Sequence, residues 1–96
     1  MIESFGDSAT EDLFHGRKTK RTRGLPADMI KVAVRKLDML NAAHRIDDLK
    51  APPANRLEAL KGEWAGFHSI RINDQFRVVF RWKEGRASEV RVVDYH

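Results

Sequence analysis

A chain of 96 residues with 42% hydrophobic and 33% charged side chains is long enough for a single core, and its composition excludes a disordered protein. It contains no cysteine, which excludes disulfides and thiolate metal sites and agrees with a reducing compartment. A signal-peptide pattern and an apolar run of ~20 residues are both missing, so we expect a cytoplasmic protein without membrane contact, folded as one domain over residues 1–96. The formal net charge of +4 predicts a polyanionic partner, and a merely solvated basic surface is the alternative.

The first residues predict a strand and a short helix. Met1–Phe5 is short and mixed, and we interpret it as a first strand. Ser8 and Glu11 have the spacing of a capping box, in which the two side chains bond free amides at a helix start. This predicts a helix of about two turns that ends at Gly16 and depends on tertiary packing for its stability.

A strongly basic segment follows, with five cations between positions 17 and 23. We interpret it as a loop that contacts the phosphates of RNA or the ribosome. The alternative is a solvated, mobile connector, because like charges repel one another and nothing apolar anchors the segment. Its basic residues are Arg17, Lys18, Lys20, Arg21 and Arg23.

Pro26 opens the longest predicted helix, which runs to about Asn41. Apolar residues recur there with three-four spacing, and we interpret this stripe as core packed on a sheet. Met29, Ala33, Leu37 and Leu40 form the stripe, Ile30 and Val34 widen it, and Lys31, Arg35, Lys36 and Asp38 are expected outside. Another helical turn is expected within residues 42–49, and the Pro52-Pro53 pair predicts an extended lead into a strand over residues 55–60.

The last third of the chain predicts three antiparallel strands, over residues 68–72, 76–82 and 88–94, because apolar and polar residues alternate there. A two-residue turn at Asn73-Asp74 would set the aliphatic side of the first strand against arginines. A register shifted by one residue keeps the apolar residues on one face, and we adopt it. That face then contains Ile70, Ile72, Phe76, Val78, Phe80, Val90 and Val92.

The expected fold class is therefore α+β, with two to three helices packed on one face of a small antiparallel sheet. The opposite face, which we call the arginine face, is expected to be uncovered and is the candidate site. It contains Arg71, Arg77, Arg81, Glu89, Arg91 and Tyr95.

No phosphate-binding loop, zinc-binding helix motif or paired histidine spacing is present, so we expect no metal and no cofactor. The remaining candidate chemistry is the metal-free cleavage of RNA through its own 2′-hydroxyl. This reaction requires a base, an acid and cations around the phosphorus. Candidate proton-transfer groups are Glu58, Asp94, Tyr95 and His96, and candidate cations are Lys61, Arg71, Arg77 and Arg91. Each of these candidates also has an ordinary structural interpretation, such as a sheet aromatic for Tyr95 or a frayed terminus for His96.

Three stretches, at residues 55–62, 68–80 and 92–96, resemble the HigB toxins of the RelE superfamily, also called plasmid maintenance system killer proteins. Their most specific parts are the string Ser-Ile-Arg-Ile-Asn-Asp-Gln-Phe-Arg, at residues 69–77, and the final Asp-Tyr-His. The N-terminal residues, the long helix and the Pro-Pro pair also fit, so the resemblance covers essentially the whole chain and implies a RelE-like fold.

The resemblance implies a bacterial type II toxin that cleaves messenger RNA in the decoding site of a translating ribosome, without a metal. It also implies inhibition by a HigA-like helix-turn-helix antitoxin, with operator DNA bound only through the antitoxin complex. By the same resemblance, Asp94, Tyr95 and His96 match catalytic positions, Arg77 a basic residue near the scissile phosphate and Lys61 a nearby cation. Glu58 stands where some members have a histidine, so the base is either this carboxylate or one of the last two residues.

Two questions stay open at this point. The net charge and the basic segment also fit a non-catalytic RNA- or DNA-binding module, although no second helix follows the long one as a helix-turn-helix would require. The antitoxin could cover the arginine face directly, or bind elsewhere and block access to the ribosome by its bulk.

Overall fold

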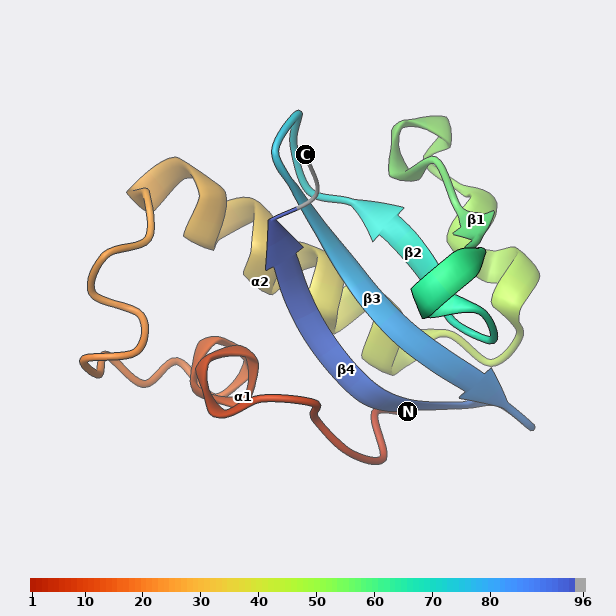
Figure 1. Ribbon diagram of the computed structural model, residues 1–96, viewed down its shortest axis with the longest axis horizontal. Coiled ribbons are helices and arrows are strands. Elements are labelled where there is room, and N and C mark those ends of the chain that lie inside the picture. Colours follow the sequence, from red (N-terminus) through yellow and green to blue (C-terminus); the bar gives the residue numbers. More distant parts are fainter. Residues whose placement is uncertain (95–96) are drawn as a thin grey trace.

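The computed structural model describes residues 1–94, which form a four-stranded antiparallel sheet with two α-helices against one face (Figure 1). The predicted α+β arrangement is confirmed. In spatial order the strands are β1 (Glu58–Ala59), β2 (His68–Arg71), β3 (Phe76–Lys83) and β4 (Arg86–Asp94). The helices are α1 (Ser8–Phe14) and α2 (Ala27–Ala42), with 3-10 helices η1 (Ile46–Lys50), η2 (Pro53–Asn55) and η3 (Gly62–Trp64).

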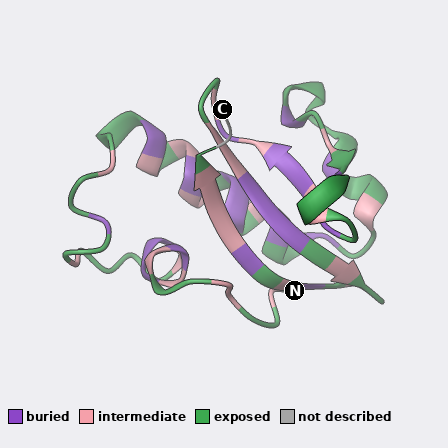
Figure 2. Cartoon of the chain, viewed as in Figure 1, coloured by how far each residue is buried: buried purple, intermediate pink, exposed green. Residues whose placement is uncertain are grey.

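The predicted stripe of α2 forms the main core with the apolar face of the sheet (Figure 2). Proline at the N-cap starts this helix, because its fixed φ suits a first turn and the amide it lacks would have no partner there. One expectation for α2 is wrong: Lys36 is buried rather than outside, and its Nζ donates a hydrogen bond to Asn55 Oδ1. The buried core residues of α2 are Met29, Ala33, Leu37 and Leu40, and those of the sheet include Ile70, Val78, Phe80 and Val90.

The adopted register of the β2–β3 hairpin is confirmed. Ile70 pairs with Val78, and Arg71 pairs with Arg77. Asn73 Oδ1 accepts hydrogen bonds from the amides of Gln75 and Phe76, at 2.9 and 2.8 Å, which holds the reversal. The turn therefore has the extra residue that the alternation of side chains required.

A bulge adjusts the register of the β3–β4 hairpin. Val92 lies opposite Val78 as expected, and the register then shifts between Val79 and Arg81. Glu89 takes a left-handed conformation at this point, with φ 51°. The extra residue lets both Val90 and Ala87 point into the core, where both are fully buried.

The N-terminal expectations need two corrections. Residues 1–5 make no strand, only two isolated parallel bridges to β4, from Ile2 to Ala87 and from Phe5 to Val90. The cap of α1 is Asp7 rather than Ser8, because the Asp7 Oδ1 accepts the Thr10 amide at 2.8 Å. The predicted end is confirmed, since Gly16 takes the positive φ of 70° just after the helix.

The predicted strand over residues 55–60 is mostly wrong. Residues 53–55 form η2, Arg56 is left-handed with φ 46°, and only Glu58–Ala59 pairs with β2. The buried amide of Asn55 explains the departure, because its Nδ2 donates to the carbonyls of Leu49 and Ala51, at 3.0 and 3.3 Å. The loop is thus wound around this side chain.

The arginine face is not uncovered, contrary to expectation. The segment that contains η3 lies over it on the side away from α2 (Figure 1). Leu60, Phe67 and Val79 are buried there in a second small core, with Trp64 and Val93 packed against it. Only part of this face is left for a site.

Candidate active site

Arg77 is the best-fixed cation on the arginine face, and only 12% of its side chain is exposed. Its Nε donates to the hydroxyl of Ser69 and its Nη2 donates to the backbone carbonyl of Arg56, both at 2.7 Å. Charge-assisted bonds of this kind are strong and directional. The guanidinium is therefore held by β2 and by the residue after η2.

The carboxylate of Glu58 lies beside this guanidinium, with its Oε1 3.7 Å from Arg77 Nη2. The side chain of Glu58 is 50% exposed, so it remains accessible from solvent. It reaches this place because β1 pairs with β2 in a register that sets Glu58 opposite Ser69. A carboxylate and a cation thus meet at the surface, as acid-base chemistry on a phosphodiester requires.

Two other predicted residues lie at the same end of the sheet, one on each face. Arg71 is the neighbour of Arg77 across β2 and β3, and its guanidinium pairs with Asp74. Asp94 ends β4 opposite Phe76, which packs on the main core, so its side chain is on the apolar face and not on the arginine face. Its Oδ2 accepts a hydrogen bond from Gln75 Nε2 at 3.0 Å. Glu58, Arg71 and Arg77 therefore share the arginine face, and Asp94 lies at the neighbouring end of β4 on the other face.

The contacts described above do not include three other predicted site residues, Lys61, Tyr95 and His96. Lys61 is exposed at the N-cap of η3, shortly after β1. Tyr95 and His96 lie outside the described residues 1–94, so their catalytic roles stay predictions.

Arg91 is half-buried, and its contacts are with the second core. Its Cζ lies 5.5 Å from the centre of the Trp64 ring. Its guanidinium also abuts the backbone of Gly6, where an added Cβ would come within 2.3 Å of Nε. The predicted contact of Arg91 with RNA stays a prediction, and the structure gives it a packing role besides.

The basic segment of residues 17–23 lies apart from this site. In Figure 1 it runs beside α1 and the start of α2, on the opposite side of the molecule from β1 and η3. The segment is an exposed connector between α1 and α2, as the alternative expected, but it is anchored, because Thr22 is buried and the segment is bonded to the buried Asp12. Two separate basic surfaces result, and only the one on the sheet contains Arg77 and Glu58.

Sequence reasoning missed two partners of Arg77. Ser69 could have been found, because the adopted register places it on the arginine face, diagonal to Arg77 across β2 and β3. The carbonyl of Arg56 gave no signal, since its position depends on the left-handed residue after η2.

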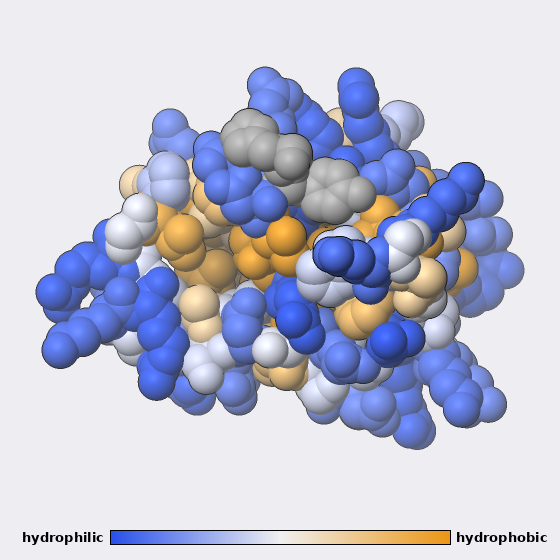
Figure 3. Space-filling model, in the orientation of Figure 1, coloured by the Kyte–Doolittle hydropathy of each residue, from blue (hydrophilic) through white to orange (hydrophobic). Residues whose placement is uncertain are grey.

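The face seen in Figure 3 is largely hydrophilic, with apolar side chains near its centre and towards the left edge. Among residues 1–94, no helix has both the length and the apolar character that a membrane span requires.

Comparison with known proteins agrees with these observations. The family model described as the RelE-like toxin of the type II toxin-antitoxin system HigB matches residues 3–96. Toxin HigB-1 of Vibrio cholerae is 44% identical over 87 residues, which are 91% of this chain and 90% of that protein. Endoribonuclease HigB of Proteus vulgaris is 29% identical over the full length of both chains.

Solved structures show the same fold at lower identity. A YoeB-YefM complex from Staphylococcus aureus aligns with a TM-score of 0.62 at 22% identity, over 100% of this chain and 95% of the matched chain. A YoeB/ParE toxin from Agrobacterium tumefaciens aligns with a TM-score of 0.54, over 99% of this chain and 98% of the other. The sequence matches, with this fold in support, show that the chain belongs to the HigB-like toxin family, the RelE-like toxins of type II toxin-antitoxin systems.

Proposed function

We propose that this toxin is an endoribonuclease that cleaves messenger RNA within a translating ribosome and so inhibits translation. The observation that carries the proposal is the pair of Arg77 and Glu58, fixed side by side on a partly open sheet face. The relative from Proteus vulgaris is named an endoribonuclease, which supports the same activity.

The reaction would proceed by attack of the substrate's own 2′-oxygen on the adjacent phosphorus. One group removes the 2′-hydroxyl proton, the bond from phosphorus to the 5′-oxygen breaks, and a second group protonates that leaving oxygen. Glu58, Asp94, Tyr95 and His96 are the proposed proton-transfer groups, with base and acid left unassigned. The products are a 2′,3′-cyclic phosphate and a 5′-hydroxyl.

Cations would stabilise the negative charge that grows on the phosphorane. Arg77 is the first of these, because its contacts with Ser69 and the Arg56 carbonyl fix its orientation before substrate arrives. Arg71 lies beside it across the strands. Lys61 is the proposed outer contact, since it is exposed and can reach a neighbouring phosphate.

We propose the ribosome as a partner because the described site is open. The carboxylate of Glu58 is half-exposed, and the covered part of the arginine face is filled by the second core rather than by a cleft. A site of this kind gains much of its rate when another surface holds the RNA in line for attack. The decoding site, where messenger RNA is already held, would supply that surface.

The test is primer extension on a message translated in a purified system, compared with the same message incubated with the toxin in the absence of ribosomes. Arg77→Lys should lower the cleavage rate about 10–100-fold, because a lysine cannot make both bonds of the guanidinium. Arg86→Lys, an exposed arginine at the far hairpin, is the matched control and should retain the wild-type rate. Equal cleavage maps for the wild type and a His96 deletion would contradict the assignment of the last residues.

A non-catalytic RNA-binding module would behave differently in the same assay. Tyr95→Phe should abolish cleavage and leave ribosome binding nearly intact if the protein is a nuclease. If it only binds RNA, only substitutions of arginine and lysine should lower its affinity for RNA, and that affinity should fall as the salt concentration rises.

The proposed inhibitor is a HigA-like helix-turn-helix antitoxin, and operator DNA would be bound only through that complex. The membership of this chain in a family of toxin-antitoxin toxins supports a protein partner. Co-purification of this toxin with the protein encoded beside its gene would test the pairing.

A further inference from the structure

Two hollows run together between the basic segment and α2, well away from the arginine face. The larger has a volume of about 330 Å³ and the smaller about 180 Å³, and both are lined by Lys18, Thr22 and Ile30. We call the two together the basic groove. Its apolar lining includes Leu13, Leu25, Ile30 and Val34.

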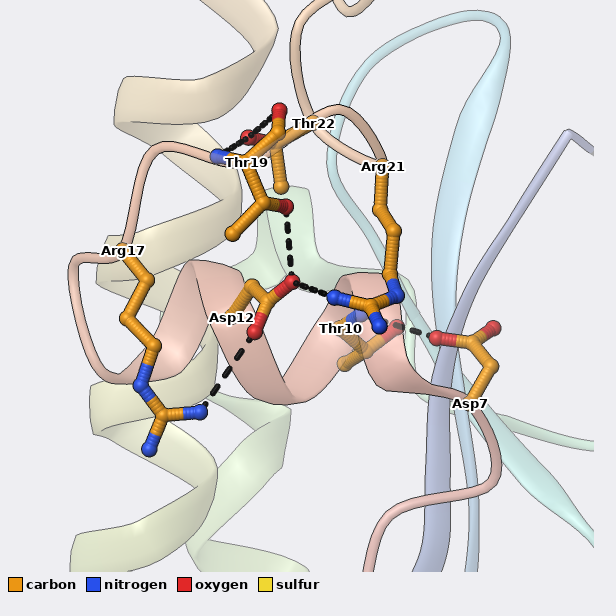
Figure 4. A network of polar contacts seen from close by, with 7 residues as sticks. All are labelled: Asp7, Thr10, Asp12, Arg17, Thr19, Arg21 and Thr22. Atoms are coloured by element: carbon orange, nitrogen blue, oxygen red, sulfur yellow. Dashed lines mark hydrogen bonds and ion pairs between the residues drawn. The ribbon is translucent and has the colours of Figure 1, made fainter.

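The wall of the basic groove is held in shape by one buried carboxylate, that of Asp12 (Figure 4). Only 5% of this side chain is exposed. It accepts hydrogen bonds from the Thr19 hydroxyl at 2.8 Å and from Arg21 Nη1 at 3.2 Å, and Arg17 Nη1 lies 3.4 Å away. The segment is thus folded before any partner binds, which lowers the entropy cost of binding.

The chemistry of the groove favours a particular kind of ligand. Lys18 and Arg23 stand at its rim, and among residues 1–94 no acidic side chain lines either hollow. Its floor is aliphatic, with Ile30 and Val34 of α2 only partly buried. A volume of this size suits a few apolar side chains, and the rim suits carboxylates beside them.

Nucleic acid fits this surface less well than a peptide does. Single-stranded RNA is held by aromatic side chains on which bases stack, and no aromatic residue within the described chain lines the basic groove. Contact of a phosphate with an aliphatic floor adds no favourable binding free energy, whereas burial of an aliphatic side chain against it does. In Figure 3, apolar surface appears between the hydrophilic left edge and the centre of the molecule.

We propose that the basic groove is the docking site for an acidic, amphipathic segment of the antitoxin, which inserts apolar side chains between residues 17–25 and α2. This proposal rests on the proposed function only in taking the partner to be a protein antitoxin. Because the groove and the site at Arg77 and Glu58 lie on opposite sides of the molecule, the antitoxin leaves the site open. Inhibition then comes from the bulk of the bound partner, which keeps the toxin out of the ribosome.

Filling the groove is the first test. Ala27 lines the larger hollow and is exposed, so Ala27→Trp should fill it without disturbing the core. Ala42→Trp, at the exposed last residue of the same helix, is the matched control. With the protein encoded beside the toxin gene as the probe, Ala27→Trp should weaken affinity roughly 30-fold or more, and the control should stay within about three-fold.

Reversing the rim charges is the second test. Lys18→Glu combined with Arg23→Glu should weaken the affinity of the toxin for the antitoxin roughly ten-fold or more and reduce the salt dependence of the association rate. Lys50→Glu combined with Lys83→Glu makes the same change in net charge elsewhere on the surface and should have little effect. Thermal unfolding of each variant confirms that it is folded.

Two outcomes would overturn the proposal. One is unchanged antitoxin affinity in both Ala27→Trp and the rim reversal. The other is a rim reversal that weakens binding to purified ribosomes while antitoxin affinity stays at the wild-type value, which would make residues 17–23 an RNA-binding surface. Failure of the proposed nuclease activity is separate, because it would show as absent cleavage by the wild type whatever the antitoxin affinities.

Discussion

The guanidinium of Arg77 donates a hydrogen bond to the backbone carbonyl of Arg56, 21 positions earlier in the chain, at 2.7 Å. That carbonyl is available because Arg56 takes a left-handed conformation, with φ 46°. A residue other than glycine adopts this region at a cost of about 1–2 kcal/mol. A strained backbone position thus helps to orient the central cation of the proposed site.

This relationship predicts opposite results for two substitutions of Arg56. Arg56→Gly keeps the carbonyl and tolerates the positive φ, so stability should change by less than about 1 kcal/mol and cleavage should persist. Arg56→Val should cost about 2 kcal/mol or more and lower the cleavage rate, because a β-branched residue resists this conformation. Urea unfolding and the ribosome cleavage assay measure both effects. Equal stability of the two variants would show that the conformation of Arg56 does not matter.

The side chain just before it, Asn55, is expected to be the most sensitive polar position in the fold. Its amide accepts a bond from buried Lys36 and donates to the carbonyls of Leu49 and Ala51. Asn55→Ala should therefore lower the free energy of unfolding by about 3 kcal/mol, since it leaves buried partners unsatisfied. Cleavage should fall as well, because the loop carries the Arg56 carbonyl.

Asn41→Ala is the matched control for that substitution. Asn41 is exposed, and its Oδ1 accepts one bond, from the Ile2 amide at 2.9 Å. Its loss should cost less than about 1 kcal/mol. Comparable losses at positions 41 and 55, measured by urea unfolding, would contradict the role given to the buried amide.

The parts of the fold that the sequence predicts well are those in which side-chain period alone decides. Alternation in the last third of the chain places Ile70 beside Val78, and the three-four stripe buries Leu37. A shift by one residue would turn the whole apolar face outward, so the burial of these side chains selects the register. The approach of Arg71 to Arg77 follows from the same register.

The predictions that were wrong concern parts of the fold that depend on contacts between segments far apart in the chain. Nothing local in Asn55 or Lys36 shows that they will meet in the core, so a strand was predicted where the loop winds around the amide. The cover on the arginine face has the same cause, since Trp64 and Phe67 find Val79 only after the sheet has formed. Local propensity carries no information about such tertiary partners.

Asp12 gives a prediction with a defined pH dependence. Hydrogen bonding from Thr19, and then the bond and charge of Arg21, hold the pKa of this carboxyl below its ordinary value of 3.8. A carboxyl with a lowered pKa stabilises the folded state above its unfolded pKa, and this contribution is lost as the pH falls through the folded pKa. Asp12→Asn should therefore destabilise the protein near pH 7, and its difference from the wild type should shrink as the pH falls below 3.8.

Urea unfolding of wild type and Asp12→Asn across this pH range measures the effect. Asp47→Asn is a suitable control, because within residues 1–94 that exposed carboxyl forms an ion pair only with the neighbouring exposed Lys50. A constant difference between wild type and Asp12→Asn from pH 7 to pH 2 would contradict the assigned charge. The same variant should also weaken antitoxin binding if the basic groove is the docking site.

His68 predicts a second pH effect, in a window above that of the carboxylates. It stacks on Phe80 with the ring centres 6.2 Å apart, and its buried Nδ1 has no hydrogen-bond partner among residues 1–94. Burial lowers the pKa of this imidazole from its ordinary value of 6.5. The unfolded chain therefore binds more protons than the folded chain below pH 6.5, so stability should fall as the pH drops through that value and level off below the folded pKa.

Replacing the imidazole by an apolar side chain should remove this loss. His68→Leu should keep stability at pH 7.5 within about 1 kcal/mol of the wild type, because no hydrogen bond of Nδ1 is given up. Between pH 7 and 5 its stability should change less than that of the wild type. His44→Leu, at an exposed position, is the control and should retain the wild-type slope. The same slope in His68→Leu as in the wild type would show that another group carries the proton uptake.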